Sequence, residues 1–206
     1  MKILIAVPCM DQVATQFCQS LVMLNKVGEC YVSFQVSSLI YTSRDQLSKK
    51  AINSGVDYIL WLDSDMTFEP DILERMIAEI KPDTILTGLY FRRVAPFHPV
   101  LFDKLEVKED GCEWSDFENI PDKPFEVGGC GFGCVLMPIE AIVSVSLNYK
   151  QLFTPVHGMG EDLAFCWRAR QSGFKIICDP SISLGHVGHT VVNRDFYDTY
   201  QKTLKE

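Results

Sequence analysis

The chain has 206 residues, of which 47% are hydrophobic and 22% are charged, as is usual for one compact globular domain. Its net charge of -8 argues against a broad electrostatic grip on nucleic acid or on an anionic membrane. No apolar run reaches the ~18 residues of a membrane-spanning helix, and Met1-Lys2 leads directly into a predicted strand, so we expect neither a membrane segment nor a signal peptide.

The first half of the chain alternates between strand and helix patterns. Buried-strand patterns cover 2–7, 30–36, 57–63 and 84–91. Helical spacing begins near Gln12 and ends near Gly28, and it recurs from a Thr42 or Ser43 cap to about Asn53 and over 70–80, with Pro70 in the first turn. This alternation predicts an α/β fold in which a mostly parallel, Rossmann-like sheet is flanked by helices.

The second half is less regular. Residues 92–126 indicate a hairpin with loops, and four glycines follow between 128 and 133. Helices are predicted after Pro138 and over 161–172, and short strands over 174–179 and 182–186. We expect one domain spanning 1–206, with a first half (1–91), an irregular second half (92–190) and a C-terminal tail (191–206).

Two carboxylates one residue apart follow the buried strand "YILWL". In an extended segment Asp63 and Asp65 point the same way, and the carboxyl ends of strands in such sheets bind ligands. Two hard oxygen ligands suit Mg²⁺ or Mn²⁺, which keep open positions for phosphate oxygens. The alternative is a solvated turn with a helix-capping aspartate.

A second acidic pair, Glu161-Asp162, stands at a predicted helix start. Asp162 is a candidate general base, and the alternative is simple favourable charge at a helix N-terminus. Further on, His186 and His189 flank a glycine in "SLGHVGH". Either is a candidate metal ligand, although a lone histidine near a strand end is more often structural.

Cations and glycines supply further candidates. Arg44, and the arginines of "YFRR" at Arg92 and Arg93, could bind phosphate or a carboxylate, with a solvated surface arginine as the alternative. The glycine run lets the backbone approach either a ligand or another strand. The eight cysteines form no Cys-x-x-Cys pair, and we expect reduced, packed cysteines in a cytoplasmic protein.

Taken in order over roughly residues 2–190, "ILWLDSDM", "GLYFRR", "VGGCGFG", "GEDLAFCWRARQSGFKI" and "LGH" resemble a GT-A-fold glycosyltransferase of the family-two type. The resemblance implies a nucleotide-sugar donor, with a UDP-sugar first, and Mn²⁺ or Mg²⁺. It implies a 1–91 half that binds the donor and a 92–190 half that serves the acceptor hydroxyl. It also implies an inverting single displacement.

The same resemblance assigns roles to individual residues. Asp162 is the implied base, beside Glu161, and the implied metal ligands are Asp63, Asp65 and His186. The implied donor-site and acceptor-side residues are Pro8, Met10, Asp11, Arg44, Asp63, Ser64, Asp65, Arg92, Gly129 and Gly131. The Cys-Met-Asp after Pro8 departs from the aromatic-Asn pattern that is commoner in the family.

Two rival functions remain open at this stage. A sugar-phosphate nucleotidyltransferase shares this kind of sheet but usually carries a Gly-rich loop with Lys or Arg after the first strand, and "VPCMDQVATQ" has none. An inactive sugar-nucleotide or glycan-binding module would keep the fold while Asp162 is dispensable. The acceptor and the oligomeric state are not indicated by the sequence.

Overall fold

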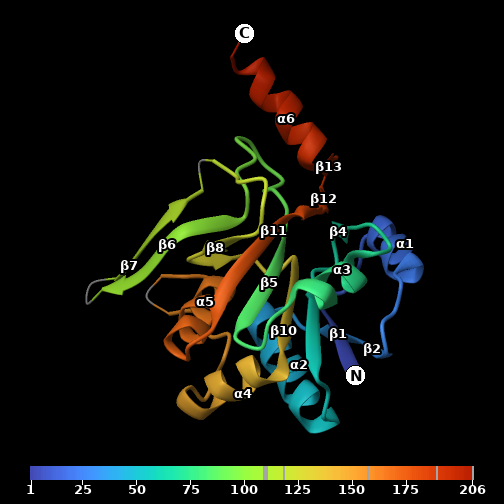
Figure 1. Ribbon diagram of the computed structural model, residues 1–206, viewed down its shortest axis with the longest axis vertical. Helices are drawn as coiled ribbons and strands as arrows, with labels where there is room; N and C mark the ends of the chain where they lie inside the picture. The colour runs from blue at the N-terminus through green and yellow to red at the C-terminus, as the bar shows by residue number, and fades with distance from the viewer. Residues whose placement is uncertain (109–110, 118, 157, 189, 206) are drawn as a thin grey trace.

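The computed structural model describes residues 1–206 except 109–110, 118, 157, 189 and 206. A seven-stranded sheet in the order β2-β1-β3-β10-β5-β11-β8 forms its centre (Figure 1). The strands are β1 (Lys2–Cys9), β2 (Glu29–Val36), β3 (Tyr58–Leu62), β5 (Thr84–Leu89), β8 (Phe125–Val127), β10 (Cys134–Pro138) and β11 (Lys175–Ser183).

The sheet is mostly parallel, as predicted. β1 pairs in parallel with β2 and β3, and β5 pairs in parallel with β11. β10 runs antiparallel between β3 and β5, and β8 is antiparallel to β11. Since β10 comes from the second half of the chain and its neighbours come from the first, both halves build one sheet.

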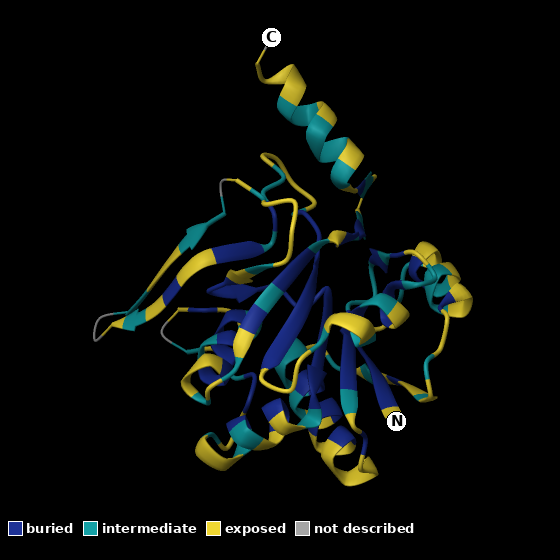
Figure 2. Cartoon of the chain, viewed as in Figure 1, coloured by how far each residue is buried: buried dark blue, intermediate teal, exposed yellow. Residues whose placement is uncertain are grey.

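Helices cover both faces of this sheet. They are α1 (Thr15–Met23), α2 (Ile40–Ser54), α3 (Ile72–Glu79), α4 (Ile139–Asn148) and α5 (Glu161–Gln171), while α6 (Arg194–Thr203) lies apart from the sheet. One buried cluster joins the sheet to α2, α4 and α5, and a second joins it to α1 and α3. Figure 2 shows the buried strands between helices whose outer faces are exposed. Burial on both faces explains the nearly continuous apolar runs of the parallel strands.

Two small sheets lie at the edges of the central one. The first contains β13 (Val191–Val192), β12 (Gly185–Val187) and β4 (Met66–Thr67). The second contains β7 (Gly111–Asp116), β6 (Leu101–Lys108) and β9 (Gly129–Cys130), which confirms the hairpin predicted within 92–126. Of the described helices, none is long and apolar enough to cross a membrane.

Several predicted boundaries were wrong for local reasons. α1 begins at Thr15 and α3 at Ile72, each later than predicted. α2 begins at Ile40, because the backbone N–H groups of Thr42 and Ser43 bond to the Leu39 carbonyl and neither residue caps the helix. The two strands predicted within 174–186 are β11, which shifts register between Asp179 and Ser183, followed by β12.

The end of the chain, predicted only as a tail, forms α6, which extends away from the central sheet (Figure 1). The side chain of Asn193 caps this helix by accepting a hydrogen bond from the N–H of Phe196. Phe196 and Tyr200 pack edge-on against Phe97 at ring-centroid distances of 5.0 and 4.9 Å. These contacts tie α6 to the loop that follows β5.

Candidate functional site

Asp63 and Asp65 lie where β3 ends, as predicted, but the segment is a turn. β3 stops at Leu62, and the N–H of Met66 bonds to the Asp63 carbonyl at 3.2 Å to close the turn. The prediction of an extended segment with parallel carboxylates was therefore wrong. Each carboxylate instead contacts a different arginine, Asp63 with Arg44 and Asp65 with Arg93.

Arg44 on α2 links the two acidic motifs. Its Nη2 donates to Asp63 Oδ1 at 2.8 Å, and its Nε lies 3.5 Å from Glu161 Oε1 at the start of α5. Its side chain is only 2% exposed, so the alternative of a solvated surface arginine was wrong. A buried ion pair of this kind holds its partners in place, because removing one charge leaves the others uncompensated.

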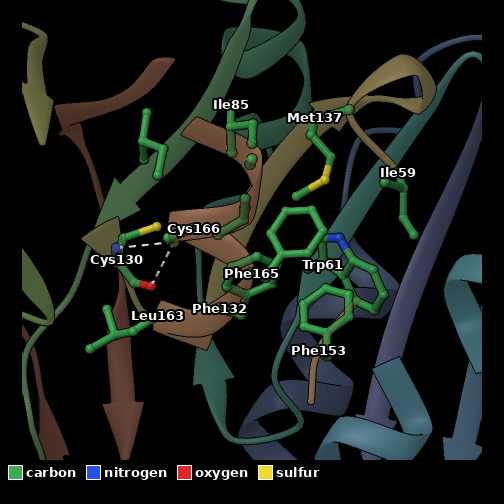
Figure 3. Close-up of a cluster of buried hydrophobic side chains, with 14 of the residues drawn as sticks. Ile59, Trp61, Ile85, Cys130, Phe132, Met137, Phe153, Leu163, Phe165 and Cys166 are labelled. Atoms are coloured by element: carbon green, nitrogen blue, oxygen red, sulfur yellow. Dashed lines mark hydrogen bonds between the residues drawn. The ribbon is translucent and has the colours of Figure 1, made fainter. Parts of the chain in front are cut away.

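Aromatic rings surround the same guanidinium. Its carbon lies 5.8 Å from the ring centroid of Trp61, 5.1 Å from Phe132 and 5.9 Å from Phe153. Figure 3 shows these three rings and Phe165 gathered in the core beside α5. Ring faces attract cations, so the aromatic cluster helps to offset the cost of burying the charge.

Asp162 follows Glu161 in the first turn of α5, and its Oδ1 accepts a hydrogen bond from the N–H of Leu163 at 2.8 Å. Burial, and then the charge of Glu161, raise the pKa of Asp162 to about 6, although the Leu163 N–H and Arg44 oppose the shift. A carboxylate with a pKa of about 6 is a stronger base than an ordinary aspartate and is still mostly charged at neutral pH.

Asp65 pairs with the more exposed of the two arginines. Its Oδ2 lies 2.9 Å from Arg93 Nη1 and 3.5 Å from His186 Nε2. Burial acts to raise the pKa of Asp65, but His186 and Arg93 outweigh it and lower that pKa below its ordinary value. Asp65 is thus held in its charged form, which is the form that binds a cation.

His186 is oriented by the backbone. Its Nδ1 lies 2.8 Å from the Phe91 carbonyl oxygen, and a carbonyl only accepts, so Nδ1 carries a proton and Nε2 is the ring nitrogen that faces Asp65. Metal-binding histidines commonly donate their second N–H in this way. Asp65 and His186 therefore offer one oxygen and one nitrogen that fit a divalent ion.

The residues that the structure describes do not complete such a site by themselves. Among the residues that the structure describes, no three His, Cys, Asp or Glu side chains lie close enough together to hold a metal. Asp63 Oδ1 is engaged by Arg44. His189, the other candidate histidine, lies outside the described residues. An ion at Asp65 and His186 would need oxygens from a ligand or from water, as is typical of ions that bind with diphosphates.

The other candidate residues lie in different surroundings. Arg92 points away from Asp65, since its Nη2 bonds to Asp116 on β7 at 2.9 Å. Pro8 is buried within β1, and Met10 and Asp11 are exposed just after that strand. Ser64 lies in the turn between the two aspartates, and its carbonyl accepts the N–H of Ala14 at 2.9 Å.

Gly129 and Gly131 are buried and closely packed. A Cβ on Gly131 would lie 2.1 Å from the Tyr90 hydroxyl, and one on Gly129 would lie 3.0 Å from side-chain carbons of Leu105 and Leu163. Of the two interpretations of the glycine run, the structure therefore supports close approach of packed protein segments at these two positions.

The sequence offered both arginines of "YFRR" as candidate cations, and the resemblance placed Arg92 in the donor site, whereas the residue that contacts Asp65 is Arg93. Tyr90 was given no role. Tyr90 is buried, its hydroxyl accepts the N–H of Gly133 at 3.1 Å, and its ring meets that of His186 edge-on at 5.5 Å. The glycine run indicated that another group approaches the backbone closely, but the spacing of residues in the sequence could not show that this group is Tyr90.

A separate hollow of about 660 Å³ lies between α1, α3 and the start of α6. Thr67, Phe68 and Gly185 form part of its wall, so it adjoins β4 and β12. None of the carboxylates described above lines it.

Comparison with known proteins adds evidence on the fold. No protein-family model matches the chain, and no curated protein matches it. Among solved structures, A197 from STIV matches 91% of this chain and 86% of its own, with a TM-score of 0.68 and 19% identity. GalNAc-T7, crystallised with UDP, GalNAc and Mn²⁺, matches 91% of this chain with a TM-score of 0.63 and 10% identity.

The chain spans 44% of the GalNAc-T7 chain that it matches. At these identities the likeness concerns the fold alone. It extends over the central sheet and the helices that cover it, since both matches span 91% of this chain. The chain therefore has a mixed α/β fold of the glycosyltransferase type, similar to GT-A.

Proposed function

We propose that this protein is a metal-dependent glycosyltransferase that moves a sugar from a nucleotide-sugar donor to an acceptor hydroxyl. One observation carries the proposal: acidic and histidine side chains from three distant segments meet at one edge of the sheet. Arg44 joins Asp63 to Glu161, and the Asp65 carboxylate lies next to His186. The glycosyltransferase-type fold supports it, since ligands of open α/β sheets bind at this edge.

The proposed donor site lies around Asp65 and His186. Both would hold Mn²⁺ or Mg²⁺, with Mn²⁺ favoured because one ligand is an imidazole nitrogen. When bound, the ion supplies positive charge that offsets the charge of a nucleoside diphosphate leaving group. A UDP-sugar is the first donor to test, because the GalNAc-T7 structure contains UDP and Mn²⁺.

Asp162 is the proposed general base. Its carboxylate would accept the proton of the acceptor hydroxyl as that oxygen attacks the anomeric carbon, and the bond to the diphosphate breaks on the opposite side of that carbon. Such a single displacement inverts the anomeric configuration. The pKa of about 6 suits this role, because Asp162 is charged at neutral pH yet basic enough to take a proton.

Arg44 and Glu161 would act through other residues. Arg44 bridges Asp63 and Glu161, so it fixes the distance between the donor-side turn and the start of α5, where Asp162 lies. Transfer requires the donor and the base to be held in one geometry, and small displacements are costly. All eight cysteines are free, which supports a proposed reducing, cytoplasmic location.

The test is a screen of UDP-, GDP- and TDP-sugars with Mn²⁺, in which nucleotide release is followed for the wild type and for Asp162→Asn. We expect release with one donor class and a 10²- to 10⁴-fold loss in the variant, the usual contribution of a general base. Full activity in Asp162→Asn would remove the base from the proposal. Absence of release with every donor, despite nucleotide binding, would instead favour a binding module.

A further inference from the structure

Arg93 occupies the position at Asp65 where a metal ion would bind. Its Nη1 lies 2.9 Å from Asp65 Oδ2, the same oxygen that lies 3.5 Å from His186 Nε2. Its Nη1 also lies 3.4 Å from the Val187 carbonyl on the strand that carries His186. The guanidinium therefore contacts both segments of the proposed metal site.

The backbone beside Arg93 is held by hydrogen bonds, while its side chain is half exposed. The N–H of Arg92 bonds to the His98 carbonyl at 2.9 Å, and the N–H of Phe97 bonds to the Val94 carbonyl at 2.9 Å. The Arg93 side chain is 50% exposed, whereas that of Arg44 is 2% exposed. An exposed ion pair contributes little stability, so Arg93 can leave Asp65 at low cost.

A divalent ion and this guanidinium cannot both sit favourably on Asp65. The two cations would share one carboxylate oxygen and repel each other at short range. If the ion brings a diphosphate, however, new negative charge appears within reach of a displaced arginine. Guanidinium groups bind phosphate oxygens through paired N–H donors.

We propose that Arg93 is a stand-in cation that neutralises Asp65 in the empty protein and then moves to the diphosphate when the metal–nucleotide complex binds. This inference rests on the proposed function. It gives Arg93 two effects of opposite sign: it weakens binding of the metal alone and strengthens binding of the nucleotide diphosphate in the presence of metal. A purely structural arginine would not produce that pair of effects.

The test uses calorimetry on the wild type and on Arg93→Ala, Arg93→Lys and Arg194→Ala. Arg194 is a control of similar exposure, since it pairs with Asp198 on α6. In titrations with Mn²⁺ alone, we expect Arg93→Ala to bind about two- to fivefold more tightly than the wild type, the range for losing a competing exposed ion pair. With UDP at saturating Mn²⁺, we expect it to bind roughly tenfold more weakly.

Arg93→Lys should lie between the wild type and Arg93→Ala in both titrations, because lysine keeps the charge and loses the paired donors. Arg194→Ala should match the wild type. If the wild type binds Mn²⁺ and UDP but Arg93→Ala changes neither affinity, or changes both in the same direction, the exchange is wrong and the proposed function stands. If the wild type binds neither Mn²⁺ nor UDP, both proposals fail. Thermal melting of each variant confirms that it is folded.

Discussion

The two aspartates at the end of β3 have opposite surroundings. Asp63 is paired with Arg44, which is buried among aromatic rings and also contacts Glu161. Asp65 is paired with Arg93, which is half exposed, and it also lies near His186. Two carboxylates separated by one residue are thus neutralised by cations of similar chemistry but very different burial.

This difference separates the part of the site that fixes geometry from the part that can exchange partners. Removing Arg44 would leave Asp63 and Glu161 without compensation, so that pair is permanent while the protein is folded. Removing Arg93 from Asp65 exposes a carboxylate that water or a cation can reach. We infer that the buried side holds the framework and the exposed side binds the ligand.

The difference between the two arginines is tested most severely by replacing each of them with methionine. Arg44→Met should lower the free energy of unfolding by roughly 3–5 kcal/mol, since it leaves two partly buried carboxylates without their buried cation. Arg93→Met should lower it by less than about 1 kcal/mol. Denaturant unfolding of both variants measures the difference, and equal losses would refute the division into a buried and an exchangeable side.

A second prediction concerns the cost of keeping Asp162 charged. Its pKa rises from 3.8 to about 6 on folding, so the free energy of unfolding falls as pH rises between these values and stays reduced above pH 6. Asp162→Asn should therefore stabilise the protein at pH 7.5 by about 1–3 kcal/mol. The gain should vanish near pH 4, and a variant that is less stable than the wild type at pH 7.5 would contradict the raised pKa.

The third prediction is the pH dependence of transfer. If Asp162 is the base, kcat/KM should be constant above about pH 7 and should fall as Asp162 is protonated, to about one tenth at pH 5. Nucleotide release measured at fixed donor concentration below KM gives the profile. A rate that does not change between pH 7 and pH 5 would mean that no group with this pKa acts in the reaction.

A smaller effect than that of Arg44→Met is predicted at Tyr90, which lies between the two sides. Its hydroxyl accepts the N–H of Gly133, so Tyr90→Phe leaves a buried donor unpaired and should cost about 1–2 kcal/mol of stability. Thr199→Ala on the exposed face of α6 serves as a surface control. A loss above that range in thermal or denaturant unfolding would show that Tyr90 supports more of the site than this one bond.

Local pattern was enough to predict much of the fold. β1 and β3 were predictable because strands buried on both faces have continuous apolar runs. Gly55, with a φ of 59°, ends α2 where the sequence indicated. Partners far apart in the chain were not predictable from pattern. The insertion of β10 between β3 and β5, and the pairing of Arg44 with Asp63 and Glu161, depend on topology.

For the candidate site, the sequence indicated residue types but not their contacts. Asp65 and His186 lie close together, and the two aspartates each pair with an arginine, Asp63 with Arg44 and Asp65 with Arg93. Spacing could not show that Arg93 contacts Asp65 while Arg92 turns to Asp116. Neighbouring residues at the end of a strand point in opposite directions, so only the structure could assign them.

The most direct test of the central claim is a titration of UDP into the wild-type protein with Mn²⁺ and again with a chelator. We predict binding with Mn²⁺ and a loss of at least about tenfold in affinity without it, because the ion would join the diphosphate to Asp65 and His186. Asp65→Asn should abolish the dependence on Mn²⁺. Equally tight binding of UDP with and without the metal would contradict the proposed donor site.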